Sequence, residues 1–166
     1  MNNYAGLIKK LHLPDGFKAP VSLEFQDLIA KRLNRRDVQP DMEAVNSSLE
    51  IIRKTRGGSW PAEAVTEEFN LLDLAWHERE FRDGDSFAYA VRDASDNYIG
   101  CFYLYPMGVR TLLSEELLDY DVDASWWVTN EGYEQGYYQK LSDALHQWLK
   151  DFPFTNVYYS NKEISA

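Results

Sequence analysis

Residues 121–150 read DVDASWWVTNEGYEQGYYQKLSDALHQWLK, and this stretch decides the fold. Residues 122–129 are apolar and aromatic over a short run, which is typical of a buried β-strand. Apolar residues then recur at a helical spacing, at Tyr138, Leu141, Ala144, Leu145, Trp148 and Leu149. Gly132 and Gly136 lie between the two segments. A strand that leads through a glycine-bearing turn into a helix brings backbone N–H groups and the positive helix end together, which favours binding of a phosphate or another anion.

Length and composition indicate one globular domain. The chain has 166 residues, of which 45% are apolar and 27% charged, and it holds no run of about 20 apolar residues that could span a membrane. Its N-terminus lacks the apolar core of a secretory signal. The single cysteine, Cys101, cannot form an internal disulfide, and we interpret it as a buried small residue. These features favour a reduced, cytoplasmic setting.

Charge limits the possible partners. The formal net charge is −10, and residues 57–166 hold seven Lys and Arg against twenty Asp and Glu. An acidic chain repels nucleic acid and gains little from an anionic membrane, so we expect neither as a partner. A small basic excess at Lys31, Arg32, Arg35, Arg36, Arg53, Lys54 and Arg56 is more typical of a solvated face. If this face has a partner, a phosphate-bearing cofactor is the more plausible one.

The first half of the chain predicts a lead-in, a strand and two helices. Residues 1–26 are interrupted by Pro14, Gly16 and Pro20 and predict an extended segment packing on a single domain of residues 27–166. Residues 27–33 predict the first strand. A helix is expected from Pro40 to the Gly57-Gly58 pair, with Met42, Val45, Leu49 and Ile52 on its buried face. A second helix begins at the N-cap Thr66 and has the predicted buried stripe Phe69, Leu72 and Trp76, with His77 structural or exposed on its flank.

The second half predicts a hairpin and a last strand. Residues 86–92 and 98–105 alternate like strands on either side of a turn-forming segment. Residues 107–120 form a long connection with a possible short helix at 114–118. Residues 155–159 predict the final strand. The element order is therefore strand, helix, helix, strand, strand, strand, helix, strand.

This order, with Trp126-Trp127-Val128 ahead of a glycine turn and a helix, resembles the GNAT superfamily of acyl-CoA-dependent N-acetyltransferases. The resemblance covers roughly residues 27–160 and is most specific from the hairpin to the helix. It implies an α/β (α+β) fold with a mixed, mostly antiparallel central sheet flanked by helices. It also implies acetyl-CoA as co-substrate, held in a cleft where the fourth strand splays from the fifth.

The resemblance assigns cofactor-binding positions to this chain. Backbone groups at Trp127, Val128 and Thr129 would pair with the pantetheine amides. The turn that follows would hold the pyrophosphate through Gly132, Tyr133, Gln135, Gly136 and Tyr137.

The chain departs from the family pattern at this turn and near its C-terminus. The family turn has Gln or Arg, two residues, Gly, one residue, then Gly or Ala, and neither glycine register reproduces it. Glu131 and Glu134 would meet an incoming phosphate at a cost of about 1 kcal/mol each at ~4 Å in water. The family also adds a helix and strands after the fifth strand, often with a tyrosine that protonates the leaving thiolate, and few residues remain here to supply them.

Acetyl transfer needs a base for the amine and a proton donor for the thiolate. Asp123 and Ser125 (with Asp121) alternate on one face of the fourth strand and are the candidate bases, directly or through water. Tyr159 (with Tyr158) is the candidate donor, although the acids can equally cap a strand end and the tyrosines fill the core. The sequence predicts no metal site.

The expected function is transfer of an acetyl group to a small amine or a protein amino group. Two alternatives remain open: a catalytically silent module of the same fold, and an unrelated interaction protein. The oligomeric state is also open, a dimer included.

Overall fold

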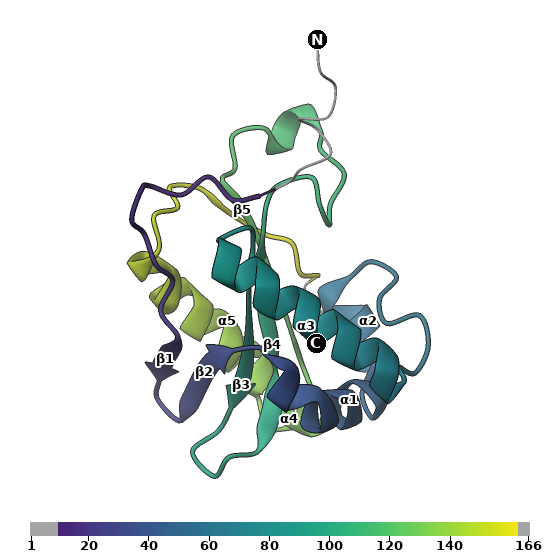
Figure 1. The fold of residues 1–166 in the computed structure, drawn as a ribbon. Helices are drawn as coiled ribbons and strands as arrows, with labels where there is room; N and C mark the ends of the chain where they lie inside the picture. The colour runs from purple at the N-terminus through teal and green to yellow at the C-terminus, as the bar shows by residue number, and fades with distance from the viewer. Residues whose placement is uncertain (1–9, 163–166) are drawn as a thin grey trace.

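The computed structural model describes residues 10–162, so residues 1–9 of the expected lead-in (residues 1–26) lie outside the described part. Its elements are β1 (Ser22–Phe25), β2 (Leu28–Arg32), η2 (Arg35–Asp37), α1 (Val38–Asn46), α2 (Leu49–Arg56), α3 (Glu67–Asp83), β3 (Phe87–Arg92), β4 (Tyr98–Tyr105), η3 (Glu115–Leu117), β5 (Val122–Val128), α4 (Asn130–Glu134), α5 (Tyr137–Trp148), η4 (Leu149–Asp151) and β6 (Val157–Tyr159) (Figure 1). The predicted hairpin, the strand of residues 122–128 and the long helix after it are confirmed.

The six strands form one sheet in the order β1-β2-β3-β4-β5-β6. Every neighbouring pair is antiparallel except β5 and β6, which run parallel. This mixed, mostly antiparallel sheet is the fold class that the sequence predicts.

Helices cover both faces of the sheet. α1, α2 and α3 pack on the face that carries Ala88, Cys101 and Trp127, and α5 packs on the face that carries Phe102 and Leu104 (Figure 1). The odd-numbered residues of β5 therefore face α1–α3 and its even-numbered residues face α5, because side chains alternate along a strand. Within residues 10–162 no helix is long and apolar enough to cross a membrane.

The helix expected from Pro40 to Gly57 is two helices, so this prediction is wrong in its length. α1 ends at Asn46, and Ser47 and Ser48 separate it from α2. The Ser47 hydroxyl donates to the carbonyl of Ala44, and the Ser48 N–H donates to the carbonyl of Val45. Serine side chains compete with helical bonding in this way, which is why the apolar spacing alone missed the break.

α3 begins as predicted but buries a different face. The Thr66 hydroxyl accepts a hydrogen bond from Phe69 N at 3.2 Å, which confirms the N-cap. However, the predicted stripe is exposed to solvent, with exposed fractions of 57% for Phe69, 71% for Leu72 and 57% for Trp76. The residues of α3 that are buried are Asn70, Leu74, His77 and Phe81.

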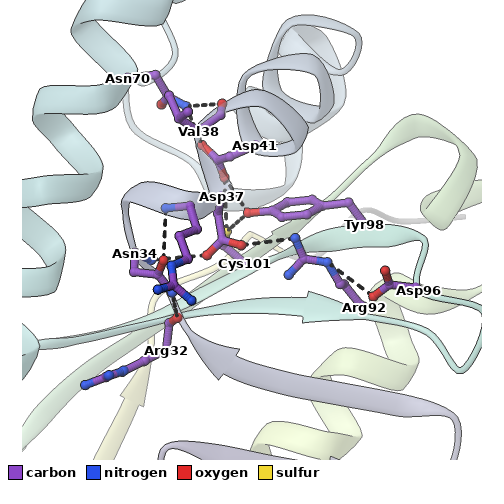
Figure 2. A network of polar contacts seen from close by, with 11 residues as sticks. Arg32, Asn34, Asp37, Val38, Asp41, Asn70, Arg92, Asp96, Tyr98 and Cys101 are labelled. Carbon is purple, nitrogen blue, oxygen red and sulfur yellow. Dashed lines mark hydrogen bonds and ion pairs between the residues drawn. The ribbon is translucent and has the colours of Figure 1, made fainter.

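A polar network explains why α3 turns Asn70 inward (Figure 2). Asn70 Nδ2 donates to the Asp41 carboxylate and to the carbonyl of Val38, each at 3.1 Å. The same carboxylate accepts from the Tyr98 hydroxyl at 2.6 Å, and Cys101 Sγ lies 3.5 Å from it. Burial raises the pKa of Asp41. The network joins α1, α3 and β4, and Cys101 is fully buried within it, as the sequence predicts.

Candidate functional site

The edge of β5 loses its strand partner halfway along. β6 pairs with β5 from Val122 to Ala124, and Ser160 N donates to the Ala124 carbonyl just beyond. The next backbone pair on this edge belongs to Trp126, and a side chain binds it. Trp126 N donates to Asn161 Oδ1 at 2.9 Å, and Asn161 Nδ2 donates to Trp126 O at 2.8 Å. Alternate residues of a strand direct their backbone groups to the same side, so Val128 also faces this edge.

Further contacts hold the segment Ser160–Lys162 beside β5. Lys162 N donates to the Thr55 carbonyl at 2.8 Å, at the end of α2. The Tyr138 hydroxyl donates to the Lys162 carbonyl at 2.8 Å, and Asn161 Nδ2 donates to the same hydroxyl at 3.2 Å. The segment therefore bridges β5, α2 and α5 at the point where β6 leaves the sheet.

The expected glycine turn after β5 is a short helix, α4, and this corrects the prediction of an open turn. Thr129 is its N-cap, and its hydroxyl accepts from Gly132 N at 3.0 Å. Tyr133 N donates to the Thr129 carbonyl, and Asn130 N donates to Ser48 Oγ at 3.0 Å. The amides of Gln135 and Gly136 donate to carbonyls within the same helix. The N–H groups before α5 are thus used by the chain itself.

α5 begins directly afterwards at Tyr137. Its N-cap residue, Gly136, has a φ of 84° and no side chain to cap the helix. The Tyr137 hydroxyl donates to Asp27 Oδ2, and Lys140 Nζ lies 2.9 Å from Asp27 Oδ1. These bonds, that of Tyr137 first, lower the pKa of Asp27, and the hydrogen bond to Asp27 raises the pKa of Tyr137 to about 12. The first turn of α5 is therefore tied to Asp27, the residue before β2.

A pocket of about 820 Å³ lies on the α1–α3 side of the sheet. It lies between the end of α2, one face of α3, the end of β4 and the loop after β4. Its lining consists of Arg56, Gly57, Gly58, Ser59, Trp60, Asp73, Trp76, His77, Glu80, Tyr103, Tyr105, Pro106, Gly108, Val109 and Arg110. Aromatic rings and charged groups of both signs thus share one hollow.

Arg56 lines the pocket and is only 6% exposed. It departs from the solvated face expected for the basic residues of this region, since the other six of them are exposed. Its Nε donates to Ser125 Oγ at 3.2 Å, and its guanidinium lies 4.2 Å from the centre of the Tyr103 ring. Within residues 10–162 no carboxylate lies within 4.0 Å of this guanidinium. A buried cation without an anion is costly and therefore unusual.

His77 lies on the opposite wall between two carboxylates of α3. His77 Nε2 is 3.6 Å from Asp73 Oδ2, and Nδ1 is 3.9 Å from Glu80 Oε1, both too long for good hydrogen bonds. Burial, followed by the charge of Arg56, lowers the pKa of His77 to about 4, so the imidazole is neutral at pH 7. Burial raises the pKa of both Asp73 and Glu80. Among the described residues Nδ1 has no hydrogen-bond partner.

Arg110 separates the pocket from the segment Ser160–Lys162. Its Nη1 donates to Ser160 Oγ at 2.8 Å, and its Nη2 donates to the carbonyls of Arg56 and Gly57. Burial, followed by the charge of Arg56, lowers the pKa of Arg110. Arg110 therefore lies between the pocket, which it lines, and the segment Ser160–Lys162 beside the edge of β5.

The predicted catalytic residues lie on two faces of the sheet. Asp123 is fully buried and accepts from Thr111 Oγ1 at 3.0 Å and from Ser160 Oγ. Ser125, also fully buried, accepts from Arg56 Nε, so both residues lie directly behind the pocket arginines. Tyr159 lies on the α5 face, where its ring stacks on His146 with 4.2 Å between ring centres, and burial raises its pKa. Asp123 and Ser125 are outside the pocket lining, on the same face of the sheet as the pocket, and Tyr159 lies on the opposite face.

The predicted cofactor-binding residues lie along the end of β5, α4 and the start of α5. Trp127 is fully buried and its Nε1 donates to the Tyr103 hydroxyl at 2.8 Å. Thr129 N donates to the Ile99 carbonyl of β4, so of Trp127, Val128 and Thr129 it is Val128 whose backbone faces the open edge. Gly132, Tyr133 and Gln135 belong to α4 and its C-cap, and Gly136 and Tyr137 begin α5.

The sequence did not point to the residues that make the pocket. Arg56, His77, Tyr103 and Arg110 come from four separate segments, and each sits in an unremarkable local pattern. The Gly57-Gly58 pair after Arg56 was interpreted as a helix end, and it also lines the pocket. Sequence patterns report local periodicity, whereas this pocket depends on long-range packing.

Comparisons with known proteins identify the fold. No protein-family model and no curated protein sequence matches the chain. Among solved structures it is similar to RimL, a ribosomal L7/L12 alpha-N-protein acetyltransferase in complex with coenzyme A, with 12% identity and a TM-score of 0.57 over 78% of this chain and 66% of that one. A ribosomal-protein-S5-alanine acetyltransferase from Vibrio fischeri gives 13% and 0.57 over 78% and 67%. A GNAT-family acetyltransferase from Bacillus anthracis gives 12% and 0.51 over 77% and 65%.

The chain thus spans about two thirds of the length of these structures. The likeness confirms the architecture that the sequence predicts. The protein has the fold of the GNAT acetyltransferases.

Proposed function

We propose that the protein is an acyl-CoA-dependent N-acetyltransferase that acts on a small amine or a protein amino group. The observation that carries the proposal is the edge of β5 beyond Ala124, where β6 leaves the sheet and a pocket adjoins the gap. An extended ligand with amide groups can pair with such an edge as an added strand does. RimL, which has the same fold, is known in complex with coenzyme A.

Acetyl-CoA would supply the activated acetyl group. In this chain the backbone of Trp126 and Val128 would hold its pantetheine arm, and the first turn of α5 would hold its pyrophosphate through amides and the helix dipole. Bonded amides in α4 leave the positive N-terminal end of α5 as the candidate for this role. Asn161 fits only if it leaves Trp126, since both of its bonds occupy the edge.

The pocket residues would handle the acceptor amine. Asp73 and Glu80 attract an ammonium group, and neutral His77 between them can accept a hydrogen bond from it, directly or through water. Asp123 and Ser125 would orient the pocket from behind, through Ser160 and Arg56 respectively. Tyr159 stacks on His146 and is not part of the pocket lining. Its role as proton donor to the thiolate stays a prediction.

Titration calorimetry with acetyl-CoA tests the proposal, and a matched pair of variants tests the placement of the pyrophosphate. Gln139→Glu adds an exposed carboxylate in the first turn of α5, and Gln147→Glu adds one near the end of the same helix. We expect Gln139→Glu to weaken acetyl-CoA binding roughly fivefold, which corresponds to about 1 kcal/mol of repulsion. Gln147→Glu should leave the affinity within a factor of about two.

Two results would contradict the proposal. One is the absence of heat at hundreds of micromolar acetyl-CoA with a folded protein. The other is binding without any acetyl transfer to a broad panel of amines and peptides, which would identify a silent binding module instead. Equal affinities for the two variants would move the pyrophosphate away from α5.

A further inference from the structure

We propose that the pocket binds a zwitterion, an amine that carries a carboxylate on a neighbouring carbon, as an α-amino acid does. Arg56 would bind the carboxylate, and the wall formed by Asp73, His77 and Glu80 would bind the amino group. Acetylation of this ligand rests on the proposed function, whereas its binding to the pocket does not.

Arg56 is the first observation. It is buried, it lines the pocket, and no described carboxylate lies within 4.0 Å of it. Its Nε is engaged by Ser125, its face lies against Tyr103, and a side-chain hydrogen bond links it to Tyr105 of the pocket lining. The planar fork of arginine matches the two oxygens of a carboxylate. A ligand carboxylate would supply the missing counter-charge.

The wall on α3 is the second observation. His77 is 8% exposed, and its Nδ1 lacks a hydrogen-bond partner among the described residues. Asp73 and Glu80 lie on either side of it, each 3.6 to 3.9 Å from a ring nitrogen. An ammonium group in the pocket can donate to Asp73 or Glu80, whose side chains are 39% and 20% exposed, whereas the Nδ1 atom of His77 is itself buried. The neutral state of His77 keeps this wall free of positive charge.

The two subsites are close to one another. The Tyr103 ring centre lies 4.2 Å from the Arg56 guanidinium and 5.6 Å from the His77 ring centre. The guanidinium and the imidazole can therefore be no further apart than these two distances taken together. A single small molecule with adjacent ammonium and carboxylate groups can reach both.

The aromatic walls favour an apolar side chain on the ligand. Trp60 and Trp76 line the pocket, and the guanidinium of Arg56 lies 5.3 Å from the Trp60 ring centre. A volume of about 820 Å³ is within the range of about 300–1,000 Å³ usual for small-molecule sites. Phenylalanine is therefore a suitable probe.

Ligands with one type of charge fit less well. A polyamine would leave Arg56 without an anion and would be repelled by it. A simple anion would meet Asp73 and Glu80 on the opposite wall. A zwitterion satisfies both walls.

The test uses three probes with the whole protein and without acetyl-CoA: L-phenylalanine, its methyl ester, which lacks the carboxylate, and 3-phenylpropanoate, which lacks the amine. We expect calorimetry or ligand-observed NMR to show phenylalanine binding at least about tenfold more tightly than either analogue. If the ester or the propanoate binds as tightly as phenylalanine, or if phenylalanine does not bind at millimolar concentration, the inference is overturned.

Two variants locate the groups responsible. Arg56→Gln should abolish the difference between phenylalanine and its ester, while Glu80→Gln should weaken both of these ligands and should bind 3-phenylpropanoate at least as tightly as the wild type does. Lys54→Gln, which removes an exposed cation of the same helix, should change none of the three affinities. Preserved discrimination in a folded Arg56→Gln variant would exclude Arg56 as the carboxylate site. If that variant does not fold, the wild-type ligand series still decides. Because no acetyl-CoA is present, failure here is distinct from failure of the acetyl-CoA titration.

Discussion

The carboxamide of Asn161 takes the place of a neighbouring strand at Trp126, with both of its hydrogen bonds made to that residue's backbone, at 2.9 and 2.8 Å. A pantetheine arm that pairs with the same edge must displace it. Each of these bonds is worth about 1 kcal/mol net, so their removal lowers the cost of displacement.

Asn161→Ala should therefore tighten acetyl-CoA binding by about tenfold or more while lowering the free energy of unfolding by about 2 kcal/mol. Calorimetry gives the first quantity and urea unfolding the second. Asn156→Ala is the control, because this exposed asparagine bonds the Asp119 carbonyl at the other end of β6. An affinity that does not rise in Asn161→Ala, or that rises equally in Asn156→Ala, would contradict competition at the β5 edge.

His77 predicts a specific dependence of stability on pH. Folding lowers the pKa of His77 from 6.5 to about 4, so the unfolded chain binds this proton more tightly than the folded chain does. The contribution of His77 to stability is then complete above pH 6.5 and is lost as the pH falls from 6.5 to about 4. The loss amounts to on the order of 3 kcal/mol.

His77→Gln removes this dependence because glutamine does not titrate. As the pH falls through this window, the wild type should lose up to about 3 kcal/mol of unfolding free energy relative to the variant. Below the window the difference between the two proteins should stay constant. Urea unfolding at pH 7, 6, 5 and 4 measures it. A difference that does not change with pH would show that the folded pKa of His77 lies near its ordinary value.

β5 and α3 show which structural features the sequence can predict and which it cannot. The strand at residues 122–128 and the helix after it were predictable because continuous apolar character and helical spacing are local signals. On α3 the apolar residues lie on two faces, and polar Asn70 and His77 occupy the buried one. Burial of Asn70 depends on Asp41, a partner in another helix that periodicity does not detect. The same limitation hid Arg56, whose partners Ser125 and Tyr103 are distant in the chain.

The two faces of α3 give a direct mutational test. Leu74 is 1% exposed and Leu72 is 71% exposed, although the sequence pattern favoured Leu72 for the core. Leu74→Ala should lower the free energy of unfolding by about 2–5 kcal/mol, because it leaves a cavity beneath the helix. Leu72→Ala should change it by no more than about 0.5 kcal/mol. A larger effect at Leu72 than at Leu74, measured by urea unfolding, would restore the predicted stripe.

Gly100 in β4 and Gly132 in α4 differ in how much room they leave for a side chain. A Cβ atom at Gly100 would lie 1.9 Å from the Trp127 carbonyl oxygen, a backbone atom that cannot rotate away. Gly100→Ala should therefore cost more than about 3 kcal/mol or prevent folding. A Cβ at Gly132 would lie 3.2 Å from Thr129 Oγ1, a side-chain atom, and helix propensity favours alanine there.

Gly132→Ala should thus change the free energy of unfolding by less than about 1 kcal/mol, in either direction. The Gly132 amide already donates to the N-cap hydroxyl of Thr129, so the acetyl-CoA affinity of this variant should also be close to that of the wild type. Thermal unfolding and calorimetry on the two glycine variants measure these effects. A strong loss of acetyl-CoA binding in a stable Gly132→Ala variant would show that the phosphate lies against α4, as the family turn implies, and would move it away from the start of α5.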